Sequence, residues 1–119
     1  MKSLLALMFA STIGLAAAQP SFLTGQALYE FCASAGNNAA HFTCLMYIEG
    51  FLDGYSAREA AICFPEGLTT GEVAAAFVRV WRSIKTQKGA ANVGPVAQAP
   101  SGHAFTSIMM AAYPCKPSQ

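Results

Sequence analysis

The segment TTGEVAAAFVRVWRSIK, residues 69–85, has the clearest helical pattern in the chain. It opens with a capping box, in which Thr69 caps the helix and the Glu72 carboxylate reaches back to Thr69. Arg79, Arg82 and Lys85 make one face of this helix basic. The other face is apolar, with side chains three and four residues apart: Val73, Phe77, Val80, Trp81 and Ile84. This pattern predicts an amphipathic helix with one buried and one basic side.

Helical spacing also marks a segment near each end of the chain. Residues 25–33 follow Thr24, which can cap a helix, and they place Leu28, Phe31 and Cys32 on one face. A last short helix is predicted to begin with Ser101 as its cap and to end at YPC, residues 113–115. Its predicted inward side chains are Phe105, Ile108, Met109 and Ala112.

Residues 40–61 are predicted to form a fourth helix. They follow the turn sequence GNN at 36–38 and precede PEG at 65–67. Gly50 and Gly54 interrupt it at a cost of up to ~1 kcal/mol each relative to Ala, and their spacing suits close approach of a neighbouring helix. Its core-facing stripe is Leu45, Ile48, Leu52 and Tyr55. No strand pattern competes, so the sequence predicts an all-α, small four-helix domain.

Residues 86–102 lack any periodic apolar pattern and are rich in glycine and proline. A stretch of this length exceeds the usual connection inside a compact domain, and such stretches are typically either functional or mobile. The segment is therefore predicted to be a mobile spacer or, alternatively, a recognition loop.

The first 18 residues have the features of a secretory signal peptide. Lys2 supplies a positive charge, residues 4–15 are mostly apolar, and the alanines at 16–18 form a small-residue cleavage site. About 12 apolar residues span roughly 18 Å as a helix, too little to cross a membrane. We expect cleavage to leave a mature chain that starts near Gln19, forms one domain over residues 19–119 and inserts into no membrane.

The charged residues divide unevenly along the chain. All six acidic residues precede residue 73, whereas five basic residues follow it: Arg79, Arg82, Lys85, Lys88 and Lys116. Without Lys2 the net charge is zero, which argues against nucleic acid as a partner. Either the two halves attract each other within one fold, or a basic face meets an acidic partner.

Four cysteines in a small exported chain predict two disulfides. If residues 40–61 form one helix, Cys44 and Cys63 are about 28 Å apart, too far for a bond. Cys32 lies next to the turn before that helix and therefore near Cys44. The predicted pairs are Cys32–Cys44 and Cys63–Cys115, which contribute about 3 and 4 kcal/mol by loop entropy.

The sequence carries no recognisable catalytic or metal-binding pattern. There is no Cys-x-x-Cys motif, and His41 and His103 have no partner at ligand spacing. Glu49 and Asp53 lie four residues apart, with Glu59 further along, a pattern typical of a solvated helix face. We therefore predict no catalytic residue, no metal site and no cofactor, and we do not expect an enzyme.

Four segments in order resemble a known family. They are FLTGQAL at residues 22–28 followed by Cys32, CLMYIEG at 44–50, CFPEGLT at 63–69, and YPC at 113–115. Together they resemble the Rap/Tai family of periplasmic immunity proteins, small helical proteins that neutralise peptidoglycan amidases delivered by type VI secretion. The chain departs from the family pattern at residues 86–102, where the family usually continues with a charged helical stretch.

The resemblance implies a periplasmic, non-enzymatic inhibitor that binds a secreted cell-wall amidase, with a homodimer as a further possibility. An alternative from another class is a periplasmic helical holdase that shields unfolded clients. Partner contacts are predicted from the basic face and from the segment that follows it: Arg79, Arg82, Lys85, Asn92, Val93, Gly94, Pro95 and Val96.

Overall fold

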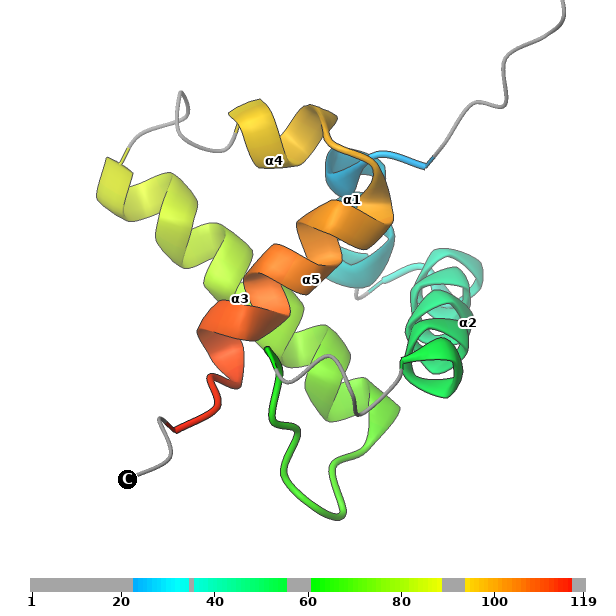
Figure 1. Cartoon of the computed structure of the whole chain (residues 1–119). Coiled ribbons are helices and arrows are strands. Elements are labelled where there is room, and N and C mark those ends of the chain that lie inside the picture. Colours follow the sequence, from blue (N-terminus) through cyan, green and yellow to red (C-terminus); the bar gives the residue numbers. More distant parts are fainter. Residues whose placement is uncertain (1–22, 35, 56–60, 89–93, 117–119) are drawn as a thin grey trace, which may run out of the picture.

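The computed structural model describes residues 23–34, 36–55, 61–88 and 94–116 of the 119-residue chain. These residues form five helices: α1 (Gly25–Ala33), α2 (Asn38–Gly54), α3 (Thr70–Lys88), α4 (Gly94–Gln98) and α5 (Ser101–Ala112). No strand occurs among them, and the β-type contacts they make are two isolated bridges, Thr24 with Pro100 and Ile62 with Pro114. The prediction of an all-α fold is confirmed, and its four helices are joined by the short helix α4 (Figure 1).

Polar caps start the first three helices. Thr24 accepts a hydrogen bond from the Ala27 amide, as predicted, and Asn37 does the same for Ala40 at the start of α2. At α3 the Glu72 carboxylate accepts from the Thr69 amide at 2.7 Å, and the Glu72 amide donates to the Thr69 hydroxyl at 3.2 Å. The predicted capping box is therefore formed. The hydrogen bond from the Thr69 amide, followed by the one from its hydroxyl, lowers the pKa of Glu72.

The second helix is shorter than predicted. It ends at Gly54, because Tyr55 has an extended backbone with φ −72° and ψ 117°. The Tyr55 hydroxyl lies 3.3 Å from both the amide nitrogen and the carbonyl oxygen of Ile62, so it fixes the chain that follows. Residues 56–60, which were predicted to be helical, lie outside the described residues. Gly50 and Gly54 also differ from prediction: no atom of another described element lies within 4 Å of a Cβ added at either one, so none of the described helices packs closely against them.

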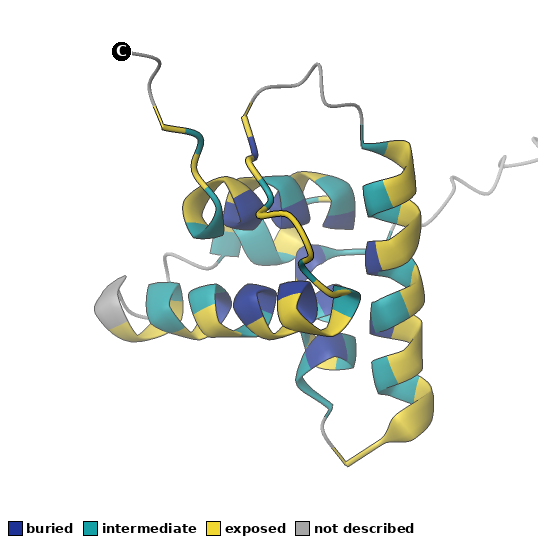
Figure 2. Cartoon of the chain, turned by 90° about the horizontal axis from the view of Figure 1, so that it is seen from below, coloured by how far each residue is buried: buried dark blue, intermediate teal, exposed yellow. Residues whose placement is uncertain are grey.

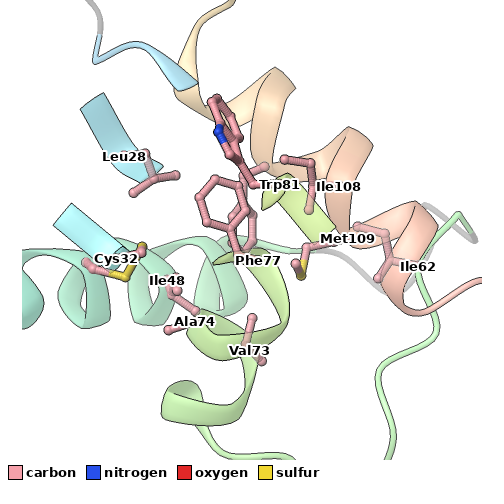
Figure 3. Packing of buried hydrophobic residues seen from close by; sticks show 12 residues of the cluster. Leu28, Cys32, Ile48, Ile62, Val73, Ala74, Phe77, Trp81, Ile108 and Met109 are labelled. Carbon is pink, nitrogen blue, oxygen red and sulfur yellow. A yellow bond between two sulfur atoms is a disulfide. The ribbon is translucent and has the colours of Figure 1, made fainter. Parts of the chain in front are cut away.

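The core lies where α3 crosses α5, with α1 and α2 packed against the same residues (Figures 1 and 3). Phe77 and Phe105 have ring centroids 5.4 Å apart, and Phe51 from α2 meets Phe105 edge to face at 4.6 Å. Val80 and Ile84, predicted to face inward, are half-buried at its edge. The largest fully buried side chains are Leu28, Cys44, Ile48, Val73, Phe77, Trp81, Phe105, Ile108 and Met109.

Both predicted disulfides are present. Cys32–Cys44 joins the end of α1 to α2, with Cα atoms 5.0 Å apart. Cys63–Cys115 joins the segment before α3 to the chain after α5, with Cα atoms 4.9 Å apart. The Cys63 amide also donates to the Tyr113 carbonyl at 2.9 Å. The second disulfide therefore closes a large part of the fold into one loop.

The prediction of a spacer at residues 86–102 is wrong over the part that the structure describes. Helix α3 continues to Lys88, and residues 94–98 form α4, whose Val96 packs against the core. The Gly25 amide donates to the Ala99 carbonyl at 2.9 Å. Ser101 is not the cap of α5 either: Pro100 holds that position without a side-chain hydrogen bond. Residues 89–93 lie outside the described part.

Gly25 allows α4 to lie against α1. A Cβ at this position would be 2.6 Å from the Ala104 Cβ and would also collide with the Val96 carbonyl oxygen. Only a glycine therefore fits between α4 and α5 without moving one of them.

Candidate partner-binding surface

The basic face predicted for α3 is present, and one of its arginines is held in place. Arg79, Arg82 and Lys85 are all exposed. The Arg82 Nε donates to the Tyr29 hydroxyl at 3.2 Å, and the Tyr29 ring stacks on Trp81 at a centroid distance of 4.9 Å. Because Trp81 is buried, this chain of contacts ties the Arg82 guanidinium to the core.

A surface hollow of about 430 Å³ lies where the end of α1 and the start of α2 meet the first half of α3. We refer to it as the hollow. Its lining combines small or apolar residues, Cys32, Ala33, Gly71, Ala75 and Val78, with three cationic or polar side chains, His41, Arg79 and Arg82. Such a combination suits a guest that is mainly apolar but carries one polar or anionic group.

His41 lines the α2 side of the hollow and also has a buried, unpaired nitrogen. Its Nδ1 has no hydrogen-bond partner among the described residues. A buried polar atom without a partner costs free energy, so this nitrogen makes the start of α2 less stable than a fully paired arrangement would.

The charge of Arg79 also acts at the end of α5. Burial raises the pKa of the Tyr113 hydroxyl, and the positive charge of Arg79 opposes that rise. Of the three predicted basic residues, Arg79 and Arg82 line the hollow and Lys85 does not.

The other predicted contact residues lie in α4 or outside the described residues. Pro95 is exposed, whereas Gly94 and Val96 are half-buried, since α4 rests on α1. Asn92 and Val93 lie outside the described part, so the structure gives no account of them. The structure therefore places the basic face and the α4 residues on two separate elements, both of which contact α1.

Sequence reasoning missed the hollow and the part played by His41. Gly71, Ala75, Val78 and Arg82 recur at helical spacing along α3, on the same side of the helix as the basic residues. That row of small residues was the available signal. His41, by contrast, comes close only through the turn between α1 and α2.

One side of α2 is exposed (Figure 2), and it includes large apolar residues. Phe42 and Met46, four residues apart, are 62% and 54% exposed, and Gly50 continues the same row. The predicted acidic pair is exposed too, with Glu49 accepting a hydrogen bond from the Thr70 hydroxyl at 2.6 Å. These carboxylates form a solvated face, and Glu59 lies outside the described residues.

Two negative findings apply to the described residues alone. No three His, Cys, Asp or Glu side chains there come together as a metal would require. Nor is any of the described helices both long and apolar enough to span a bilayer.

A small, disulfide-bonded helical fold with a basic face and an apolar hollow is typical of a binding protein. The comparisons name its family: the model of the Rap1a immunity proteins matches residues 24–115, and the chain belongs to that family. The predicted resemblance is thereby confirmed. No curated protein and no solved structure matches the chain.

Family membership fixes the broad function. The chain is an immunity protein against secreted effectors, and membership of this family implies an inhibitor that binds an effector protein. Immunity proteins of this family are typically periplasmic.

Proposed function

We propose that the chain acts in the periplasm, where it binds and inhibits a peptidoglycan amidase delivered by type VI secretion. The observation that carries this proposal is the family match over residues 24–115, nearly the whole predicted mature chain. The two disulfides support an oxidising compartment, since such bonds persist outside the cytosol. The signal-peptide pattern of the first 18 residues supports export to that compartment.

Inhibition is proposed to work by covering the active-site cleft of the amidase. The contacts would come from Arg79, Arg82 and Lys85 and from the segment that includes Asn92, Val93, Gly94, Pro95 and Val96. Exposed arginines steer an acidic partner and speed its association more than they set the final affinity. The α4 residues sit on a rigid support, because hydrogen bonds and packing hold the segment against α1.

A protection assay tests both the partner and the compartment. Amidase effectors of type VI secretion, from the same bacterium as this chain, are each exported to the periplasm of a sensitive bacterium, together with the complete chain or with a chain that lacks residues 2–18. The complete chain should prevent lysis by one of them, whereas the shortened chain, which stays in the cytoplasm, should not. Lysis by all of them despite the complete chain contradicts amidase inhibition, and protection by the shortened chain contradicts periplasmic action.

Exposure of Phe42 and Met46 favours a second candidate, a periplasmic holdase for unfolded proteins. Two disulfides restrain the opening that would expose more apolar surface, so this candidate depends on the outer face of α2 alone. A holdase would suppress aggregation of reduced, unfolded lysozyme, and Phe42→Ser with Met46→Ser would abolish that effect. An immunity protein would leave the aggregation unchanged.

A further inference from the structure

The hollow between α1, α2 and α3 places two arginines of the proposed contact surface beside apolar walls. Its volume of about 430 Å³ falls within the range of ligand pockets, roughly 300–1,000 Å³. Cys32, Ala33, Ala75 and Val78 give it apolar walls, whereas Arg79 and Arg82 bring two positive charges to it. No acidic residue lines the hollow, so those charges meet no carboxylate there.

One of its two arginines is oriented before an anion arrives. Because the Arg82 Nε donates to the Tyr29 hydroxyl, the orientation of the guanidinium is restricted in the absence of a guest. A guanidinium carries five N–H donors, so the remaining ones stay available to a carboxylate. On the opposite, α2 side, His41 lines the hollow.

We propose that the hollow binds a carboxylate attached to an apolar body, supplied by a segment of the effector in which an acidic residue adjoins an apolar one. This proposal rests on the proposed function for the source of the segment, but the chemistry of the hollow is independent of it. The apolar part lies against Ala33, Ala75 and Val78, and the carboxylate accepts hydrogen bonds from Arg79 and Arg82. The effector thus contacts the chain in the hollow, where α1, α2 and α3 meet, in addition to its proposed contacts with α4.

The chemistry is tested without any effector. Hexanoate, with hexanol as its uncharged counterpart, is titrated into the ¹⁵N-labelled exported chain with both disulfides intact. Hexanoate should give saturable shifts at the Ala33, Ala75 and Val78 amides and at the Arg82 Nε–H, and hexanol should bind at least fivefold more weakly. Equal binding of the two, or shifts that do not saturate or that scatter over the surface, overturns the proposal.

Matched variants locate the site. Ala75→Phe fills the hollow from α3, and Ala111→Phe places the same ring at an exposed alanine of α5, outside the hollow. Arg79→Gln and Arg82→Gln each remove one charge from the hollow, and Lys116→Gln removes one charge from an exposed lysine that does not line it. Hexanoate should bind at least fivefold more weakly to Ala75→Phe, Arg79→Gln and Arg82→Gln. The Ala111 and Lys116 variants should bind it as well as the unchanged chain does. Equal losses in target and control variants overturn the assignment of the site.

The same variants then decide the source of the carboxylate. With the effector, Ala75→Phe should weaken binding at least tenfold, about 1.4 kcal/mol, and Ala111→Phe should not. If Ala75→Phe abolishes hexanoate binding but leaves effector affinity intact, the effector segment is not the occupant and the proposal fails. If the unchanged chain binds hexanoate in the hollow but binds and inhibits no amidase, the proposed function fails and the anion site stands.

Discussion

Gly25→Ala probes the contact that turns residues 94–100 from a connection into part of the fold. The added Cβ would meet the Val96 carbonyl oxygen and lie 2.6 Å from the Ala104 Cβ. Neither obstacle can rotate away, because one is backbone and the other is a methyl group fixed to α5. We therefore expect α4 to shift away from α1.

The cost follows from two effects. Overpacking by one methyl group typically destabilises a protein by about 1–3 kcal/mol. Displacement of α4 also strains the hydrogen bond from the Gly25 amide to the Ala99 carbonyl, 2.9 Å long, which contributes about 0.5–1.5 kcal/mol. Together these effects predict a loss of about 1.5–4.5 kcal/mol. Each kcal/mol lowers Tm by roughly 4–8 °C for a domain of this size.

Gly50→Ala is the matched control, since it makes the same change within a helix where nothing lies within 4 Å of the new Cβ. It should raise stability by about 0.5–1 kcal/mol through helix propensity. Urea unfolding of the oxidised chain, followed by far-UV circular dichroism, measures both variants. If Gly25→Ala unfolds at the same urea concentration as the unchanged chain, α4 does not press on α1 and the reasoning is refuted.

Three further predictions concern covalent and electrostatic features. Removing Cys63–Cys115 by two Ala substitutions should cost about 4 kcal/mol in urea unfolding, against about 3 kcal/mol for Cys32–Cys44, because it closes the longer loop; the reverse order would contradict the loop-entropy account. The pKa of Glu72 is lowered on folding, so its capping contribution is present above the unfolded pKa of about 4.5 and is lost as pH falls through the folded pKa. Glu72→Gln should flatten the stability–pH curve below pH 4.5, and an unchanged slope would argue against the cap. Intact mass of the exported chain should show a start near Gln19 and no alkylation without prior reduction, and any uptake of alkylating reagent would contradict two disulfides.

Local patterns predicted much of the fold. The capping box at Thr69 and Glu72 and the burial of Phe77 and Trp81 follow from spacing within one helix, so they could be read directly. The pairing of Cys32 with Cys44 also depended on short-range geometry. These features need no knowledge of how distant segments meet.

What the sequence left undetermined depends on contacts between distant segments. Helix α4 has five residues, too few to be stable alone, and its packing on α1 and the Gly25–Ala99 hydrogen bond hold it in place. The early end of α2 at Gly54 accompanies two hydrogen bonds with Ile62: the Tyr55 hydroxyl donates to its carbonyl and accepts from its amide. The hollow combines three helices, and the row of residues along α3 gives no sign of the α1 and α2 residues that meet it.

The packing of α4 on α1 changes the expected effect of replacing residues 90–99. A mobile spacer, which the sequence predicted here, would tolerate a Gly/Ser segment of equal length. The structure predicts instead that it would remove the packing of Val96 and Ala97 against the core. Loss of partner affinity in that variant would therefore mix lost contacts with lost stability, and single changes at the exposed Pro95 give a cleaner test of recognition.

Titration of amidase activity tests the central claim most directly. Purified secreted amidase hydrolyses peptidoglycan in the presence of increasing amounts of the exported chain with both disulfides formed. The account predicts that hydrolysis falls in proportion to added chain and reaches its minimum near one equivalent, as expected for a tight inhibitor that covers the cleft. Hydrolysis that stays at its full rate under a tenfold excess of correctly folded chain would contradict the account.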